Sequence, residues 1–277
     1  MQKKSINYSN QSTLSSAIEF VQWLSHAATS EKELAAKVLA LQTTRLTPNI
    51  ICPNIDSDDQ THPYQNFNLG LHVGDCQQQV LKNRQSLQKL LPENTKIQWL
   101  EQVHGNEVVE VQQVSTVAIV ADAAVTDKKN TCLAIMTADC LPILLVSKYG
   151  DEIAAIHGGW RPLAANIIIN TLNKMKTPNA DVCAWLGPCI SKNAFEVGAE
   201  VKTEFVQQNE CFSSAFTAKA NGKYLADLHA IARLQLASLG VNQISALSEC
   251  TYANTDKYYS YRKNAVTGRM ATLICLL

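Results

Sequence analysis

The chain has 277 residues, with 24 Lys and Arg side chains balanced by 24 Asp and Glu side chains, and 46% of the residues are hydrophobic. This length and composition are typical of a globular protein with one sizeable core. Because the formal net charge is zero, there is no general basic field, and we expect binding neither to nucleic acid nor to an anionic membrane.

The amino-terminal residues and the cysteine pattern indicate in which cellular compartment the protein is expected. Asn7 and Ser9 stand where a signal peptide needs its apolar core. Leu141 to Val146 is one of the longest apolar runs, and it is far shorter than the roughly 20 residues of a membrane-spanning helix. The nine cysteines contain no Cys-x-x-Cys pair, and we interpret most of them as small buried hydrophobes. We therefore expect a cytoplasmic protein.

Apolar residues in the first forty positions recur at helical spacing. They are Leu14, Ala17, Ile18, Val21, Leu24, Leu34, Val38 and Leu41. The spacing predicts a helical appendage over residues 1–41, packed on a main domain of residues 42–277. Residues 47–63 contain Pro48, Pro53 and Pro63 together with an acidic run, which predicts a long polar loop.

The rest of the chain alternates between short apolar runs and amphipathic segments. Strands are expected at 97–100, 108–111, 117–120, 132–136, 153–156, 182–186, 243–247 and 270–276, and helices at 80–91, 162–175, 199–207 and 226–239. Asp227 is expected to cap the last helix. This pattern indicates a mixed α/β fold of the α+β class, in which a single domain of mixed sheets is covered by helices.

Three reactive side chains stand where predicted strands end. His104 follows the strand at 97–100, Cys140 follows the run that stops at Met136, and His157 closes the run that begins at Ile153. Two glycines after His157 allow a tight turn and leave room beside the imidazole. We expect these positions to be accessible for chemistry.

Two imidazoles and a thiolate form a ligand set that suits zinc with one coordination position left open. The long intervals between His104, Cys140 and His157 resemble no local metal-binding knuckle, however. From the residues alone, two interpretations stay open: an open metal site, or histidines that hydrogen-bond locally beside a core thiol. Asp139 either orients a ligand imidazole or caps the turn that it occupies.

Six short motifs occur in a characteristic order. They are Gln102-Val103-His104-Gly105, Thr137-Ala138-Asp139-Cys140-Leu141-Pro142, His157-Gly158-Gly159-Trp160-Arg161, Leu186-Gly187-Pro188, Phe195-Glu196-Val197-Gly198 and Ser260-Tyr261-Arg262. In this order the chain resembles, from about Asn66 onward, the family first named multicopper polyphenol oxidoreductase, or laccase-like. Members of that family are now regarded as zinc-dependent purine nucleoside phosphorylases with adenosine deaminase activity.

The resemblance implies a fold, a reaction and a cofactor. The fold would be a layered α/β/β/α sandwich, and the substrates would be phosphate and a purine nucleoside, namely adenosine, inosine or methylthioadenosine. Zinc would be bound by His104, Cys140 and His157. Copper is less attractive because six histidines in all are too few for the several centres of a laccase. The oligomeric state would be a monomer or a homodimer.

The resemblance also suggests further site residues. The catalytic set would be Cys140, His157, Asp139 and Arg161, and the substrate-binding set would be Arg45, Asn68, Arg84 and Arg262. Our own hypothesis is that Arg161 and the following helix start, with Pro162 in its first turn, bind phosphate. The chain departs from the family pattern after Arg45, where Leu46-Thr47-Pro48 replaces a glycine pair and a serine, and at Gly158, where alanine is usual.

Other functions remain open at this stage. Cys140 as a nucleophile with His157 as its base would make a metal-free hydrolase or deamidase. Such a pair has no need of His104, so loss of His104 discriminates between the two enzymes. Polyphenol oxidation, the older family label, and a scaffold role with a vestigial site are the remaining alternatives.

Overall fold

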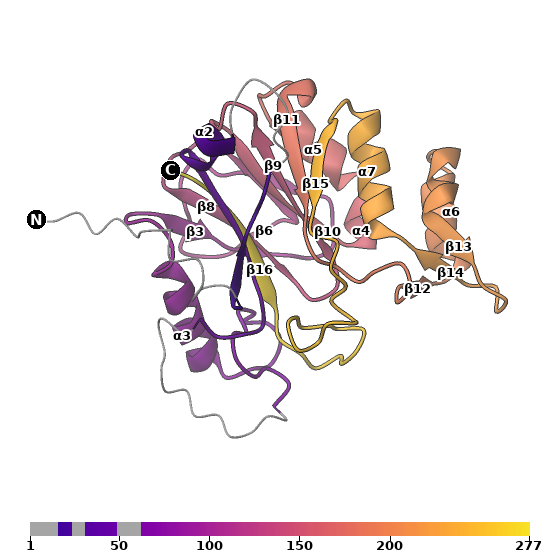
Figure 1. The fold of residues 1–277 in the computed structure, drawn as a ribbon, viewed down its shortest axis with the longest axis horizontal. Helices are drawn as coiled ribbons and strands as arrows, with labels where there is room; N and C mark the ends of the chain where they lie inside the picture. Colours follow the sequence, from indigo (N-terminus) through magenta and orange to yellow (C-terminus); the bar gives the residue numbers. More distant parts are fainter. Residues whose placement is uncertain (1–15, 24–30, 49–61) are drawn as a thin grey trace, which may run out of the picture.

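The computed structural model describes residues 16–23, 31–48 and 62–277. Its core consists of two sheets that lie face to face (Figure 1). The first sheet has the order β1 (Ile18–Phe20), β2 (Val38–Thr43), β16 (Met270–Leu276), β8 (Thr131–Thr137) and β3 (Lys96–Gln98). The second has the order β15 (Gln243–Ala246), β11 (Val182–Leu186), β9 (Leu141–Ser147), β10 (Ile153–Gly158), β7 (Ala123–Thr126) and β5 (Val108–Glu110).

The central strands are continuous apolar runs because both of their faces are covered. Every residue of β8, β9 and β16 is buried. One core cluster lies between the two sheets and includes Leu133 of β8, Ile274 of β16 and Leu144 of β9. Strands buried on both faces read as uninterrupted hydrophobic segments, which explains why these runs were visible in the sequence.

Helices cover both outer faces. The helix α3 (Gln77–Gln88) packs on the first sheet, and the helices α4 (Trp160–Ala164), α5 (Ile167–Lys174) and α7 (Leu228–Ser238) pack on the second (Figure 1). The side chain of Asp227 accepts a hydrogen bond from the backbone of Ala230 and caps α7 as predicted. The layers therefore form the α/β/β/α sandwich that the resemblance implied.

Smaller elements complete the described chain. A two-stranded sheet pairs β4 (Leu100–Glu101) with β6 (Ile119–Val120). At the right of Figure 1 lies a lobe formed by α6 (Ala199–Val206) and by the strands β12 (Glu196–Val197), β14 (Tyr224–Ala226) and β13 (Phe216–Ala218). Short helical turns occupy α2 (Glu31–Ala35), η1 (Asn179–Asp181) and η2 (Glu210–Ala215).

The helices predicted in the first forty-one residues are wrong for most of the described part. Ile18–Phe20 and Val38–Thr43 are strands, and β2 pairs with both β1 and β16 in the first sheet. The only described helix there is α2, which has five residues. Apolar residues at helical spacing were outweighed by sheet pairing, because propensity and spacing are weak against tertiary context. Most of the predicted 47–63 loop lies outside the described residues.

Two further features differ from the sequence expectations. The helix predicted over 162–175 is broken into α4 and α5 at Asn166, which has a left-handed backbone with φ of 66°. Cys132 and Cys275 face each other in register between β8 and β16 and form a disulfide. Cys183 and Cys189 are buried thiols, as expected.

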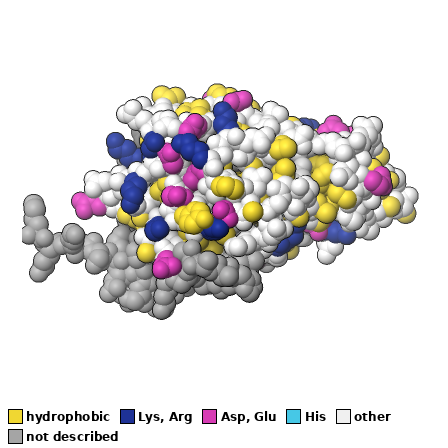
Figure 2. Space-filling view, turned by 90° about the horizontal axis from the view of Figure 1, so that it is seen from above, with side chains coloured by type: hydrophobic (Ala, Val, Ile, Leu, Met, Phe, Trp, Pro, Cys, Tyr) yellow, Lys and Arg dark blue, Asp and Glu magenta, His cyan; other side chains and the backbone are white. Residues whose placement is uncertain are grey.

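The charged surface is mixed in sign. On the face shown in Figure 2, Lys and Arg side chains lie among Asp and Glu side chains, in agreement with the balanced composition. Within the described residues, none of the helices combines the length and the apolar character needed to cross a membrane.

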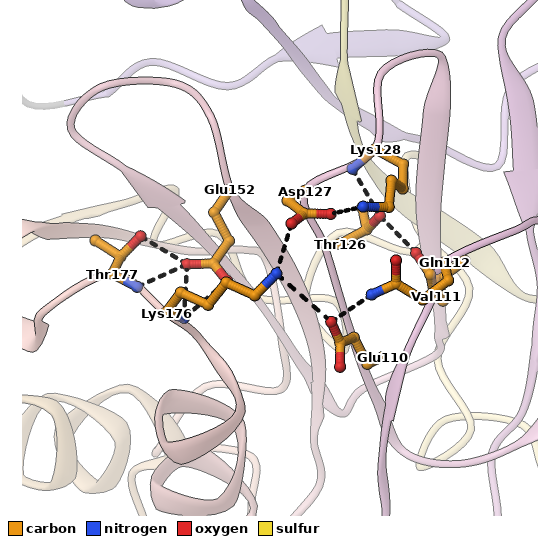
Figure 3. A network of polar contacts seen from close by, with 9 residues as sticks. All are labelled: Glu110, Val111, Gln112, Thr126, Asp127, Lys128, Glu152, Lys176 and Thr177. Carbon is orange, nitrogen blue, oxygen red and sulfur yellow. Dashed lines mark hydrogen bonds and ion pairs between the residues drawn. The ribbon is translucent and has the colours of Figure 1, made fainter.

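A buried carboxylate anchors the turn after α5 (Figure 3). Glu152, which is 4% exposed and directly precedes β10, accepts hydrogen bonds from the backbone N–H groups of Lys176 and Thr177, each at 2.8 Å. The Thr177 hydroxyl donates to the same carboxylate at 2.6 Å. This network lies at the end of β10 that is remote from His157.

Candidate metal centre

The β9–β10 pairing brings two of the predicted ligands together. In this antiparallel register His157 faces Pro142, and Gly158 faces Leu141. Cys140, the residue immediately before β9, therefore lies next to the end of β10 that carries His157. Cys140 and His157 are 17 residues apart in the sequence and lie close together because β9 and β10 pair as antiparallel neighbours.

His104 reaches the same point from the loop between β4 and β5. Its ligand atom and those of Cys140 and His157 all lie within 4.8 Å of one another. The two imidazole rings meet edge to face, with centroids 4.6 Å apart and an interplanar angle of 77°. The distance from Sγ of Cys140 to Nε2 of His104 is 4.0 Å. The predicted convergence of the three side chains is confirmed.

Asp122 forms hydrogen bonds with both His104 and His157. This fully buried aspartate lies between β6 and β7, and one of its carboxylate oxygens is 2.8 Å from Nδ1 of His157. The carboxylate also accepts the backbone N–H groups of Val103, His104 and Gly105 at 3.2, 3.0 and 2.6 Å. The backbone of His104 is left-handed, with φ of 60°, and its N–H group is one of those that Asp122 accepts. The contact at Nδ1 leaves Nε2 of His157 free to face the centre.

The Cys140 thiol and the His157 imidazole shift each other's pKa. Burial alone would raise the pKa of Cys140, but the neighbouring His157 and His104 together outweigh it and lower the pKa to about 6. Burial alone would lower the pKa of His157, but Cys140 and Asp122 outweigh it and raise the pKa to about 9. Both shifts run in the direction that favours a thiolate beside an imidazolium.

The donor set fits a metal ion. Two imidazole nitrogens and one thiolate are the ligand types of zinc sites with an open position, and a carboxylate behind a ligand histidine is a regular companion of such sites. His104, Cys140 and His157 provide the three donors, and Asp122 provides the carboxylate. This chain can therefore hold a metal ion at this point.

A cavity of about 280 Å³ opens over the cluster. It lies near the lower limit of small-molecule sites, which measure roughly 300–1,000 Å³. The residues around it include His104, Cys140, Trp160, Arg161, Tyr261 and Arg262. The cavity therefore combines metal-binding donors, aromatic rings and two guanidinium groups.

Two predicted arginines face this cavity. The guanidinium of Arg161 lies 4.3 Å from the centroid of the Trp160 ring. Arg262 donates from its guanidinium to the carbonyl oxygen of Glu196 at 3.1 Å and lies over the ring of Phe195. The helix after His157 begins at Trp160 and contains Pro162 in its first turn, as predicted, but it has only five residues.

Arg45 and Asn68, both predicted to bind substrate, make contacts that fix loops. Arg45 donates to the carbonyl oxygen of Thr255 at 2.7 Å. Asn68 is fully buried, donates to the Asp75 carboxylate at 2.9 Å, and accepts the backbone N–H of Arg269 at 2.8 Å. Their contacts account for both side chains without a substrate.

Arg84 is also held by the protein. It donates to the carbonyl oxygen of Leu69 at 2.9 Å, and its guanidinium lies 3.8 Å from the centroid of the Trp99 ring. Burial lowers the pKa of Arg84 to about 10. Its partners tie α3 to the loop of residues 67–70.

Asp139 does not occupy the orienting position that we considered for it. Its carboxylate accepts hydrogen bonds from Thr251, Ser260 and Arg262, all in or beside the loop that borders the cavity. The residue that contacts the ligand imidazole is Asp122. The sequence signal for Asp122 is a charged residue within the apolar run around Ala121 and Ala123.

Comparison with known proteins places the chain in a family. Residues 57–277 match the family described as multi-copper polyphenol oxidoreductase laccase. The chain belongs to this family. The expectation drawn from the six motifs is confirmed.

Individual proteins similar to this chain have names that differ from the family description. The purine nucleoside phosphorylase YfiH of Shigella flexneri is 41% identical over 215 residues, which cover 78% of this chain and 88% of the relative. A purine nucleoside phosphorylase of Pseudomonas aeruginosa is 40% identical, with 77% and 87% covered. A solved structure of a Neisseria meningitidis protein superposes with a TM-score of 0.81 at 37% identity, over 93% of this chain and 98% of that one. The description of the family mentions copper, whereas the relatives from Shigella flexneri and Pseudomonas aeruginosa are named purine nucleoside phosphorylases.

Proposed function

We propose that this protein is a zinc-dependent purine nucleoside phosphorylase acting on adenosine, inosine and methylthioadenosine, with adenosine deaminase as a side activity. The observation that carries the proposal is the convergence of His104, Cys140 and His157 beside a cavity that also contains Arg161 and Arg262. The names of relatives that are 40–41% identical support the purine nucleoside as substrate and phosphate as co-substrate.

The reaction joins a phosphate oxygen to C1′ of the ribose while the bond from C1′ to the purine nitrogen breaks and the purine takes up a proton. A zinc ion held by the three ligands would supply Lewis-acid polarisation at the reacting centre. The guanidinium groups of Arg161 and Arg262 bind the phosphate anion and orient it. Asp122 keeps the His157 ring in one orientation throughout.

The purine is recognised by aromatic side chains. Trp160, Phe195 and Tyr261 line the cavity, and flat rings provide stacking surfaces for a base. Arg45 acts behind this surface, because it bonds to Thr255 in the chain segment that leads to Tyr261 and Arg262. Asn68 and Arg84 hold the loop of residues 67–70, which contributes no residue to the lining of this cavity.

The test begins with elemental analysis of protein purified without added metal. The protein is then incubated with adenosine and inosine, with and without phosphate. We expect about one zinc per chain, base release that requires phosphate, and loss of both in His104→Ala. His62→Ala is the matched control, because His62 packs against Tyr64 and is not a member of the cluster. Base release without phosphate, or undiminished in His104→Ala, contradicts the proposal.

A second candidate follows from one specific contact. The Cys140 thiol lies within 4.8 Å of a ring nitrogen of His157, and Asp122 contacts Nδ1 of the same ring, so thiol, imidazole and carboxylate follow one another as in a thiol hydrolase. In such an enzyme His104→Ala retains activity, chelators have no effect, and alkylation of Cys140 abolishes turnover. The zinc phosphorylase requires the opposite result with the chelator, so one titration separates the two.

A further inference from the structure

Asp139 connects a metal-ligand residue to the loop that borders the cavity. It directly precedes Cys140 and is 8% exposed. Its carboxylate accepts the hydroxyl groups of Thr251 at 2.6 Å and Ser260 at 3.0 Å, and the backbone N–H of Arg262 at 2.6 Å. One buried carboxylate therefore binds both ends of the loop formed by residues 251–262.

The backbone of Asp139 arranges another wall of the same cavity. Its carbonyl oxygen accepts the backbone N–H of Ile190 at 2.9 Å, and Ile190 lines the cavity. The φ of Asp139 is 89°, in the left-handed region that L-residues rarely adopt. Asn and Asp are the side chains that tolerate this region best. Replacing Asp139 with Asn therefore changes the carboxylate while leaving the backbone conformation accessible.

The loop has exposed residues where it meets the cavity. Tyr261 is 55% exposed, and Arg262 and Lys263 are also exposed. Both Tyr261 and Arg262 line the cavity, whereas Tyr258 and Tyr259 anchor the middle of the loop in the core. The contact to Asp139 fixes the exposed part relative to the metal centre.

We propose that Asp139 is a positioning residue that holds the substrate-binding loop, residues 251–262, against the metal centre, so that nucleoside binding depends on its carboxylate and metal binding does not. This rests on the proposed phosphorylase function. The division of labour follows from the contacts, because the ligand His157 is held by Asp122 and the position of Cys140 is set by β8 and β9. Asp139 acts through the loop and touches neither imidazole in the hydrogen bonds described.

The kinetic test compares Asp139→Asn with the double variant Thr251→Val/Ser260→Ala. Asn offers one acceptor oxygen in place of two and leaves a buried donor without a charged partner. We expect unchanged zinc per chain and a KM for inosine raised roughly tenfold to a hundredfold, the range for losing a hydrogen bond to a charged group. The double variant should show a smaller rise in KM, since Asp139 keeps the N–H of Arg262. Loss of zinc in step with activity, or an unchanged KM, overturns the proposal.

A second readout requires no enzyme activity. Trypsin cleaves after Arg262 and Lys263, and cleavage there depends on local opening of the loop. We expect Asp139→Asn to be cut faster at these two sites. The matched control is Glu152→Gln, because Glu152 is also a buried carboxylate that accepts three donors from a loop, but at the far end of β10 (Figure 3).

Glu152→Gln should accelerate cleavage after Lys176 and leave cleavage after Arg262 unchanged. Equal cleavage after Arg262 in the wild-type protein and in Asp139→Asn overturns the positioning role. If the wild-type protein shows no phosphorolysis while the cleavage pattern is as expected, the proposed function fails and the loop contact stands. The two failures are therefore distinguishable.

Discussion

Nδ1 of His157 lies 2.8 Å from a carboxylate oxygen of Asp122, and the same carboxylate accepts the backbone N–H of His104 at 3.0 Å. A single buried carboxylate thus fixes one candidate metal ligand through its ring and a second through its backbone. Burial alone would raise the pKa of Asp122, but the contact with His157 and the hydrogen bonds from the backbone of Gly105 and His104 together outweigh it and lower the pKa, which favours the ionised carboxylate.

Replacing Asp122 with Asn should weaken metal binding. The amide fits the space, but it carries no charge and presents N–H groups to donors that require an acceptor. We expect zinc affinity to fall roughly 10- to 100-fold, the usual effect of losing a carboxylate behind a ligand histidine. Competition with a chromophoric chelator measures this directly. Asp127→Asn is the control, because Asp127 pairs with Lys128 and Lys176 away from the centre, and an equal loss there would point to a general effect.

Gly159 lies against two of the ligand residues. A Cβ at this position would be 3.2 Å from Sγ of Cys140 and 3.5 Å from Cδ2 of His104. The φ of Gly159 is −64°, which any residue adopts, so Gly159→Ala tests the contact and not backbone strain.

We expect Gly159→Ala to displace a ligand by a few tenths of an ångström and to reduce kcat about tenfold, because small misplacements in a site are costly. The thermal midpoint should change little, since the fold outside the site is unaffected. Steady-state kinetics and a thermal scan on the same sample provide the measurement. A full loss of folded protein with no selective effect on kcat would count against this explanation.

The sequence predicted the parts of the fold that depend on local pattern. The expected bounds of the strands at 182–186 and 270–276 agree with β11 and β16, because continuous apolar runs leave little choice of register or period. The strand β2 was mistaken for part of a helix because β16, one of its two partner strands, lies far along the chain. Pairing of that kind leaves no local trace.

The three candidate metal ligands were predictable from the sequence, but the residues that hold them in place were not. The motifs identified His104, Cys140 and His157, and the structure brings them together. Asp122 was missed because its role arises from the position of β7 beside β10, which only the folded chain reveals. The bonds of Asn68 to the Asp75 carboxylate and to the backbone of Arg269 were likewise not predictable from its motif.

Glu249 should make stability depend on acid pH. It pairs with Lys257 at 2.7 Å and accepts from the hydroxyl of Tyr258 at 2.9 Å. Burial alone would raise the pKa of Glu249, but these partners outweigh it and lower the pKa below the unfolded value of 4.5. The stabilisation is therefore complete above pH 4.5 and is lost as pH falls through the folded pKa.

The test compares urea unfolding of the wild-type protein and Glu249→Gln at pH 7 and near pH 3.5, with metal removed from both. We expect the variant to be less stable at pH 7 by under about 1 kcal/mol, because the pair is partly exposed to solvent. The difference should shrink at the lower pH. A difference that stays constant between the two pH values would show that the ionised pair is not its source.

Arg161 should control the use of phosphate. It is exposed, lines the cavity and stacks on Trp160 beside the metal-binding residues. Arginine binds phosphate through paired N–H groups, so Arg161→Ala should raise the KM for phosphate roughly tenfold or more while the KM for inosine and the zinc content stay near their original values. Arg233→Ala is the control, because Arg233 is also exposed but borders a different cavity. Initial rates across a phosphate series distinguish the two variants, and an unaltered phosphate dependence in Arg161→Ala would assign the anion to another group, with Arg262 as the next variant to measure.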